Sequence, residues 1–309
     1  MFQLFQTPHI DFIAYRKIAY VISIVMILIG GVSLVLHKGL NFGIDFKGGT
    51  SIVIRFEENV STGDIRNALS KIDLSGSEIK SLGGKNEFLI YVKQIKGMSA
   101  TEVAKQIEQA LSASISVPYE VRQVDTVGPK IGSELKKNAL KAAIFSLLLI
   151  MVYVGWRFDT IFGIAAVAAL FHDSFIALGV LSVFNFEIGM KELAALLTIV
   201  GYSINDTIVV YDRMRENMKI HRNDDLVVIM NRSINETLTR TIITAVTVFV
   251  VVLILLLFGG EVNRGFSLAM LVGTIVGCYS TVFVASPLAW EWYKRHGGGK
   301  QMRMAKKKA

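Results

Sequence analysis

An aspartate lies inside an apolar stretch of this sequence, where a carboxylate is costly. Asp206 falls within the run 193–211, so a membrane-spanning helix there would hold its side chain away from water. A charge at that depth costs about 3 kcal/mol to insert, which makes an ionisable residue in a span a functional-site hypothesis by default. Arg240, at the start of a later apolar run, is a candidate partner. An acid and a base on neighbouring spans predict an ion-coupled device rather than a passive anchor.

Polar side chains accompany both residues at helical spacing. Positions three, four and seven residues apart share one face of a helix. The first such stripe consists of Tyr202, Ser203, Asp206 and Arg213. The second consists of Thr237, Arg240, Thr244 and Thr247. Because a polar stripe against lipid is unfavourable, we expect both stripes to face the interior of a helix bundle, with Asp206 beside Arg240.

Two interpretations of these buried polar groups stay open. Burial and a nearby guanidinium have opposite effects on the protonation of a carboxylate, so their balance can bring proton uptake within reach of ambient pH. Alternatively, Asp206 and Arg240 form a static pair that sets packing, and Asn205 and Thr207 add interhelical hydrogen bonds. The pair His172-Asp173 in another apolar run could be a second station for the ion or a packing pair.

The apolar residues collect into runs that are long enough to cross a bilayer. The chain has 309 residues, of which 52% are hydrophobic. A spanning helix needs roughly 20 apolar residues. Six runs meet this length: 18–36, 138–156, 160–184, 193–211, 241–258 and 265–290. We therefore predict a polytopic helical membrane protein. The single cysteine, Cys278, excludes an internal disulfide and a cysteine-based metal site, and its place in the last run predicts simple packing.

The net charge of +8 follows the predicted topology rather than a nucleic-acid surface. Basic residues gather on one side of the spans, at Arg16, Lys17, Arg157, Arg213, Arg215, Lys219, Arg222, Arg232 and Lys306–Lys308. The short connections on the other side hold only Lys191 and Arg264. The positive-inside rule places both termini and a 213–239 loop in the cytoplasm, with the basic residues anchoring lipid headgroups.

The polar segment between the first two spans has the pattern of a small folded domain outside the cytoplasm. Its alternating and amphipathic stretches predict strands at 50–56, 78–82, 87–94 and 119–126, and helices at 61–71 and 101–111. Ser61 and Asp64 have the spacing of a capping box, and Gly83-Gly84 indicates a turn. The order β-α-β-β-α-β is that of a ferredoxin-like domain. The predicted organisation is 1–38 for the N-terminus and first span, 39–135 for this domain, 136–293 for a five-helix bundle and 294–309 for a flexible basic tail.

Four sequence motifs together resemble the SecD/SecF family of the bacterial protein-export machinery, in its SecF form. They are Asn41–Thr50 (NFGIDFKGGT), Val127–Gly132, Gly201–Asn217 and Asn235–Ile242. They occur in order along a six-span layout. The resemblance implies half of an RND-type unit that pairs with SecD in the inner membrane and uses the proton-motive force in late steps of export. It also implies the SecYEG channel, unfolded exported polypeptide and membrane lipids as partners.

The resemblance also implies roles for residues of this sequence. Asp206 and Arg240 fall on the family's proton-pathway positions, and Asp173 falls on its His-Asp position. Secondary polar positions in the spans are His172, Ser203, Asn205, Thr207 and Thr244. We expect no enzyme activity, no cofactor, no metal and no nucleic-acid partner, and the coupling ion could be H⁺ or Na⁺.

Three other functions fit parts of this sequence pattern. A purely structural subunit, whose partner carries the ion traffic, fits the same spans. A half-size RND-type exporter would need a second half and larger outer segments. An intramembrane aspartyl protease could use Asp173 and Asp206, but the Gly-x-Gly-Asp context is missing and Arg240 would have no role.

Overall fold

The structure is a computed structural model, and it describes residues 8–82, 86–93, 95 and 98–295. It divides into two compact units. One unit contains a β-sheet and comprises residues 42–141 and 187–190. The other is helical and comprises the remaining described residues. The predicted Gly83-Gly84 turn and the glycine- and lysine-rich tail after Arg295 lie outside the described residues.

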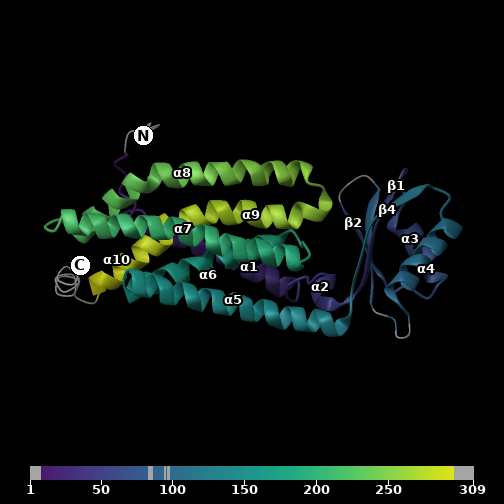
Figure 1. Cartoon of the computed structure of the whole chain (residues 1–309). Coiled ribbons are helices and arrows are strands. Elements are labelled where there is room, and N and C mark those ends of the chain that lie inside the picture. Colours follow the sequence, from purple (N-terminus) through teal and green to yellow (C-terminus); the bar gives the residue numbers. More distant parts are fainter. Residues whose placement is uncertain (1–7, 83–85, 94, 96–97, 296–309) are drawn as a thin grey trace. The chain divides into compact units, whose positions relative to one another are not determined.

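Within the described residues, six helices are long and apolar enough to cross a membrane, which confirms all six predicted spans (Figure 1). They are α1 (Arg16–Leu36), α5 (Pro129–Arg157), α6 (Thr160–Val183), α7 (Met190–Ile220), α8 (Leu226–Phe258) and α9 (Glu261–Ser280). The last continues through a π-helical turn, η1 (Thr281–Ala285), into α10 (Ser286–Arg295). A short helix, α2 (Ile44–Lys47), was not foreseen.

Helices α7 and α8 extend well beyond their apolar stretches. The predicted loop at 213–239 is therefore wrong, because only residues 221–225 separate the two helices. Polar contacts hold the extensions together in place of apolar ones. The Arg213 Nε donates to Glu236 Oε2 at 2.6 Å, and the Asn217 amide donates to Ser233 Oγ at 3.0 Å. Hydropathy does not detect helix that is stabilised in this way.

Small residues bring α1 and α6 into backbone contact. A Cβ atom built on Gly30 would lie 2.8 Å from the Cα of Gly179. Beside this contact the hydroxyls of Ser33 and Ser182 are hydrogen-bonded at 2.9 Å. Small residues at helix interfaces supply van der Waals contact in membranes, where lipid is as apolar as the helices themselves.

This contact predicts different effects for two adjacent substitutions. Gly30→Ala should destabilise the full chain by about 1–3 kcal/mol, since overpacking forces backbones apart. Gly31→Ala is the matched control, because nothing lies within 4 Å of a Cβ at that position. Thermal unfolding of the two variants in one detergent measures the difference. Equal melting temperatures would contradict the packing assigned to Gly30.

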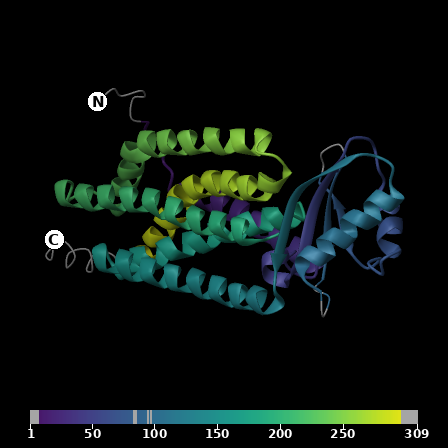
Figure 2. The same ribbon diagram turned by 45° about the vertical axis from the view of Figure 1, so that its right-hand side comes forward.

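The spans differ in how much of their apolar surface this chain covers itself. The apolar window of α6 is 56% buried, whereas that of α5 is 6% buried and that of α8 is 11% buried. Figures 1 and 2 show α8 and α5 on opposite sides of the helical unit, with α6, α7 and α9 between them. The faces of α5 and α8 therefore meet lipid or another membrane protein.

The sheet unit has the ferredoxin-like order that its pattern predicts. Its strands are β1 (Gly49–Phe56), β2 (Glu78–Ser81), β3 (Glu87–Val92) and β4 (Tyr119–Val127), and its two longer helices are α3 (Thr62–Ser70) and α4 (Ala100–Ser114). The strands form an antiparallel sheet in the order β2-β3-β1-β4. Figure 2 shows α3 and α4 against one face of this sheet. Alternate residues such as Ile52, Ile54 and Ile90 form the core beneath these helices.

Capping boxes begin both of these helices. The predicted box is confirmed: Ser61 and Asp64 exchange hydrogen bonds at the start of α3. A second one, between Ser99 and Glu102, begins α4 and was not foreseen. Hydrogen bonds from Ser61 hold the pKa of Asp64 below its usual value, so this cap persists at neutral pH.

Candidate functional site

The carboxylate of Asp206 is buried within the helical unit. Asp206 lies midway along α7 and is 2% exposed. Its hydrogen-bond partner among the described residues is the Cys278 thiol on α9, with Sγ 3.7 Å from Oδ2. The Tyr202 hydroxyl lies 4.0 Å from the same sulfur. A thiol is a weak donor, so most of the hydrogen-bonding capacity of this carboxylate is available to a proton or a small cation.

Two glycines on α9 allow this close approach to α7. A Cβ on Gly277 would lie 3.1 Å from the Cβ of Ser203, and one on Gly273 would overlap Ile199. The Gly273-x-x-x-Gly277 motif thus serves as a close-packing face. The motif also brings Cys278, which was expected only to pack, to the Asp206 carboxylate.

Arg240 does not form an ion pair with Asp206 among the described contacts, and acts on it only through longer-range electrostatics. Its side chain is exposed, as is that of Thr247. The expectation that this whole stripe faces the bundle interior is therefore wrong for these two residues, although Thr237 is buried. Arg240 and Thr247 are exposed because α8 lies at the side of the helical unit. Thr244 and Thr247 instead donate to carbonyls of their own helix.

His172 and Asp173 form a buried, hydrogen-bonded polar cluster within the described membrane helices. Asp173 is fully buried, and its Oδ1 lies 2.9 Å from His172 Nδ1. Its Oδ2 accepts hydrogen bonds from Ser203 on α7 at 2.6 Å and from Ser280 on α9 at 2.7 Å. On the other side of the imidazole, Nε2 lies 2.9 Å from Ser23 on α1. The cluster thus joins four membrane helices.

Several partners in these clusters were missed from the sequence. They are Ser23, Tyr279, Ser280 and Thr281. Single hydroxyls within apolar runs carry no signal of their own, because they cross a membrane at little cost and bond to backbone equally well. The π-helical turn that begins at Thr281 is a second unforeseen feature, and such turns occur often at functional sites.

The remaining predicted site residues divide between buried and exposed positions. Thr207 is buried, and its hydroxyl lies 2.9 Å from that of Thr281. Asn205 is exposed on α7, on a face that also exposes Thr198 and Gly201. Asn205 therefore does not join the buried clusters within this chain.

The segment NFGIDFKGGT has a clear structural role in the sheet unit. The Asp45 carboxylate accepts a hydrogen bond at 2.6 Å from the backbone N–H of Met190, the first residue of α7. A carboxylate at a helix N-terminus satisfies an N–H that the helix leaves unpaired. Gly43 N–H also donates to the carbonyl of Ile188 at 2.9 Å. Asp45 therefore fixes residues 188–190 against the segment that precedes β1 within the sheet unit.

The paired glycines of this segment, Gly48 and Gly49, lie against the backbone of Val92 and the side chain of Tyr91. Gly48 and Gly49 have φ of 71° and 123°, and a Cβ on Gly49 would lie 2.5 Å from the carbonyl oxygen of Val92. The Tyr91 hydroxyl donates to the Gly48 carbonyl at 2.7 Å. Burial, together with nearby Glu78 and Glu187, raises the pKa of Tyr91, so the hydroxyl remains a donor.

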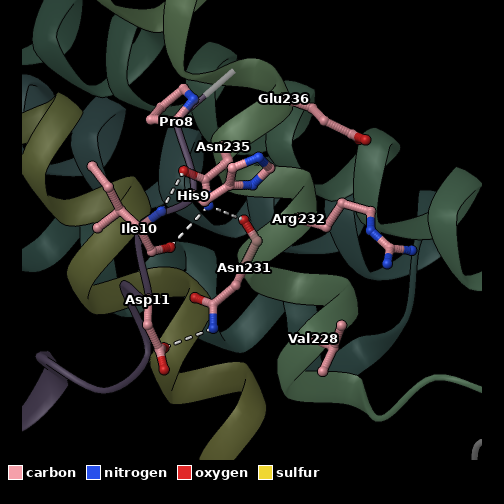
Figure 3. A pocket seen from close by; sticks show the side chains of 9 residues that line it. All are labelled: Pro8, His9, Ile10, Asp11, Val228, Asn231, Arg232, Asn235 and Glu236. Atoms are coloured by element: carbon pink, nitrogen blue, oxygen red, sulfur yellow. Dashed lines mark hydrogen bonds between the residues drawn. The ribbon is translucent and has the colours of Figure 1, made fainter. Parts of the chain in front are cut away.

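A cavity of about 480 Å³ lies where the N-terminal segment crosses α8 (Figure 3). Asn235 exchanges hydrogen bonds with both backbone groups of Ile10, at 3.1 and 2.9 Å. One turn away, the Asn231 side chain accepts from Ile13 N–H and donates to Asp11. Since these amides are already engaged with backbone, the cavity marks an anchoring point for residues 8–13 rather than a ligand site.

This anchoring predicts a local effect for the double variant Asn231→Ala, Asn235→Ala. Losing four bonds, at about 1 kcal/mol each, should speed amide exchange in residues 9–13 by up to roughly a thousandfold. Hydrogen exchange followed by mass spectrometry on the full chain measures it. Asn223→Ala, an exposed asparagine between α7 and α8, is the control. Unchanged exchange in the double variant would refute the anchor.

Comparison with known proteins agrees with this architecture. The family model for the C-terminal part of the protein export membrane proteins SecD/SecF matches residues 106–295, and the SecD/SecF GG motif matches residues 33–60. The protein translocase subunit SecF of Desulfurispirillum indicum is 41% identical over 293 residues, covering 93% of each chain. That of Rhodothermus marinus is 40% identical, covering 98% of this chain and 100% of its own. The chain belongs to the SecF family.

Solved structures show the same fold in a longer protein. SecDF from Thermus thermophilus, a translocon-associated membrane protein, matches with a TM-score of 0.85 and 37% identity over 94% of this chain. A second SecDF structure, in a super-membrane-facing form, matches with a TM-score of 0.67 over 96% of this chain. This chain spans 40% of either SecDF chain. It is a multi-pass membrane protein and a SecF-type subunit of the SecD/SecF translocase.

Proposed function

We propose that this SecF-family subunit uses the proton-motive force to assist late steps of protein export across the bacterial inner membrane. The observation that supports this most is the buried Asp206 carboxylate, whose described hydrogen-bond partner is one weak thiol donor. A buried carboxylate with so little solvation binds a proton readily, and one that has released it is attracted to a cation.

A change of charge at Asp206, on proton binding or release, would act on Arg240. With Asp206 ionised, the attraction draws the guanidinium on α8 toward α7, and protonation removes the attraction. Because α8 is little buried by its own chain, it has room to move against α7. Moving one charge through the membrane potential is worth about 2.3 kcal/mol per 100 mV, which is enough to bias two helix arrangements.

A SecD-type subunit is the partner that we propose for the exposed polar residues of the spanning helices. These residues are Asn205 on α7 and Arg240 and Thr247 on α8. Lipid is an unfavourable neighbour for such groups, so another membrane protein is expected to cover them. The matching SecDF chains are long enough to supply it, since this chain accounts for 40% of each.

The other proposed partners follow from topology. With both termini in the cytoplasm, the sheet unit lies on the outer side, where it would meet unfolded polypeptide leaving a SecYEG channel. The basic residues on the cytoplasmic side would contact lipid headgroups. No cofactor is expected. H⁺ is the coupling ion that we propose, and Na⁺ is the alternative that the gradient experiment distinguishes.

The proposal is tested in sealed inner-membrane vesicles that hold this chain, its SecD-type partner and a translocation channel. Release of an exported polypeptide is timed after a proton gradient or an equal sodium gradient is imposed. We expect the proton gradient alone to speed release. Equal rates with and without either gradient would instead support a purely structural subunit, for which the fully bonded Asp173 cluster is the favouring observation.

A further inference from the structure

A continuous chain of hydrogen bonds crosses the helical unit through His172. The Tyr279 hydroxyl on α9 lies 2.6 Å from the carbonyl of Ala19 and 3.1 Å from the Ser23 hydroxyl on α1. Ser23 Oγ in turn lies 2.9 Å from His172 Nε2, and His172 Nδ1 lies 2.9 Å from Asp173 Oδ1. All of these atoms belong to one compact unit.

The direction of each bond follows from the number of hydrogens available. A carbonyl only accepts, so the single Tyr279 hydrogen is directed at Ala19. The bond between Tyr279 and Ser23 must then use the Ser23 hydrogen. With that hydrogen engaged, the Ser23 oxygen can only accept from His172, which places a hydrogen on Nε2. The tautomer of this imidazole is thereby fixed.

The same counting applies to Asp173. The Ser280 hydroxyl has one hydrogen and two acceptors, and it lies closer to Asp173 Oδ2, at 2.7 Å, than to the Gly277 carbonyl, at 3.1 Å, so its hydrogen is directed at Oδ2. The Ser203 hydroxyl donates to the same oxygen at 2.6 Å, so Oδ2 carries no proton. The contact between Nδ1 and Oδ1, at 2.9 Å, then needs one hydrogen between two lone pairs. We propose that His172 and Asp173 together form a binding site for a single proton, held between Nδ1 and Oδ1 and separate from Asp206.

The hydrogen-bond network around His172 and Asp173 is complete when one proton is shared. It is disrupted when that proton is removed or when a second proton is added. Removing the proton sets the Nδ1 lone pair against a carboxylate lone pair at 2.9 Å, which is repulsive. Adding a second proton places it on Oδ2, where the Ser203 and Ser280 hydroxyls would have to turn away. Ser280 has an alternative acceptor in the Gly277 carbonyl at 3.1 Å. Either change would loosen the connection of α1 and α6 to α7 and α9.

The charged surroundings favour this electrically neutral state. The titratable groups near the pair are Tyr279 and Cys278 on α9 and Asp206 on α7. Among the described ion pairs, no lysine or arginine contacts His172 or Asp173. An unbalanced charge would therefore be buried without compensation, whereas a pair that shares one proton carries no net charge.

Nitrogen-15 NMR of the full chain in lipid nanodiscs, with ¹⁵N-labelled histidine, tests this assignment. His172 is assigned by its loss in His172→Gln. We expect Nε2 to carry a hydrogen and a second, deshielded proton to be present at Nδ1. An Nδ1–H tautomer with a bare Nε2, or a bare Nδ1, would overturn the proposal.

Asp173→Asn separates proton binding from packing. The amide can still donate to Nδ1 and accept from both serines, so the chain should assemble with His172 as a neutral Nε2–H tautomer and without the shared proton. Ser182→Ala, which removes a bond between α1 and α6 that involves no acid or base, should leave the shared proton in place. Persistence of the signal in Asp173→Asn would refute the site. Asp206→Asn should leave the signal unchanged, so this proposal and the proposed function can fail independently.

Discussion

Asp206→Asn is expected to slow the export of a secreted precursor nearly to the rate of a strain that lacks this subunit. Asparagine has almost the shape of aspartate and can still accept from Cys278, so packing against α9 should survive. It cannot bind or release a proton, however, so the change of charge that would attract Arg240 is lost. The expected loss is therefore one of coupling, with assembly intact.

Pulse-chase export in cells whose only copy is the variant measures this effect at matched protein levels. Asp206→Glu is the control, because it keeps a titratable carboxyl at the same point of α7 and should retain part of the activity. Two results would count against coupling. One is normal export by the asparagine variant, and the other is equal loss in the glutamate variant together with poor assembly.

Gly49→Ala is expected to destabilise the sheet unit strongly. The backbone φ of 123° at Gly49 is unfavourable for any side chain and costs about 1–3 kcal/mol by itself. In addition, the new Cβ would lie 2.5 Å from the carbonyl oxygen of Val92, which belongs to the neighbouring strand β3. The Val92 carbonyl oxygen is part of the backbone, so no flexible side chain can move to relieve this contact.

Hydrogen exchange of β1 and β3 amides in the full chain reports this destabilisation. We expect much faster exchange in Gly49→Ala than in the parent chain, together with weaker export. Gly76→Ala is the matched control in the same unit, since nothing lies within 4 Å of a Cβ there and its φ is not positive. If both variants exchange at the parent rate, the strained position of Gly49 has been misjudged.

The parts of the fold that hydropathy and alternation govern were predictable from the sequence. All six spans and the order of strands and helices in the sheet unit follow from apolar length and period. The extensions of α7 and α8 were not predictable, because interhelical pairs such as Arg213–Glu236 stabilise them. A sequence shows that these residues are polar, and gives no sign of which helix they meet.

The acidic residues of the candidate site were predictable from the sequence, whereas the positions of their partners were less so. Asp206 and Asp173 stand out because a carboxylate in an apolar run is costly. Their partners did not stand out, since Ser23 and Ser280 are ordinary small residues in a membrane helix. The position of Arg240 on an exposed face was also missed, because helical spacing tells which residues share a face and not what that face meets.

The most direct test of ion coupling through Asp206 is proton movement itself. This subunit and its SecD-type partner would be reconstituted into liposomes that enclose a pH-sensitive dye, and a proton gradient imposed. We expect the parent pair to acidify the lumen faster than the Asp206→Asn variant, whose rate should equal that of empty liposomes. Equal proton uptake by the parent and the asparagine variant would contradict it.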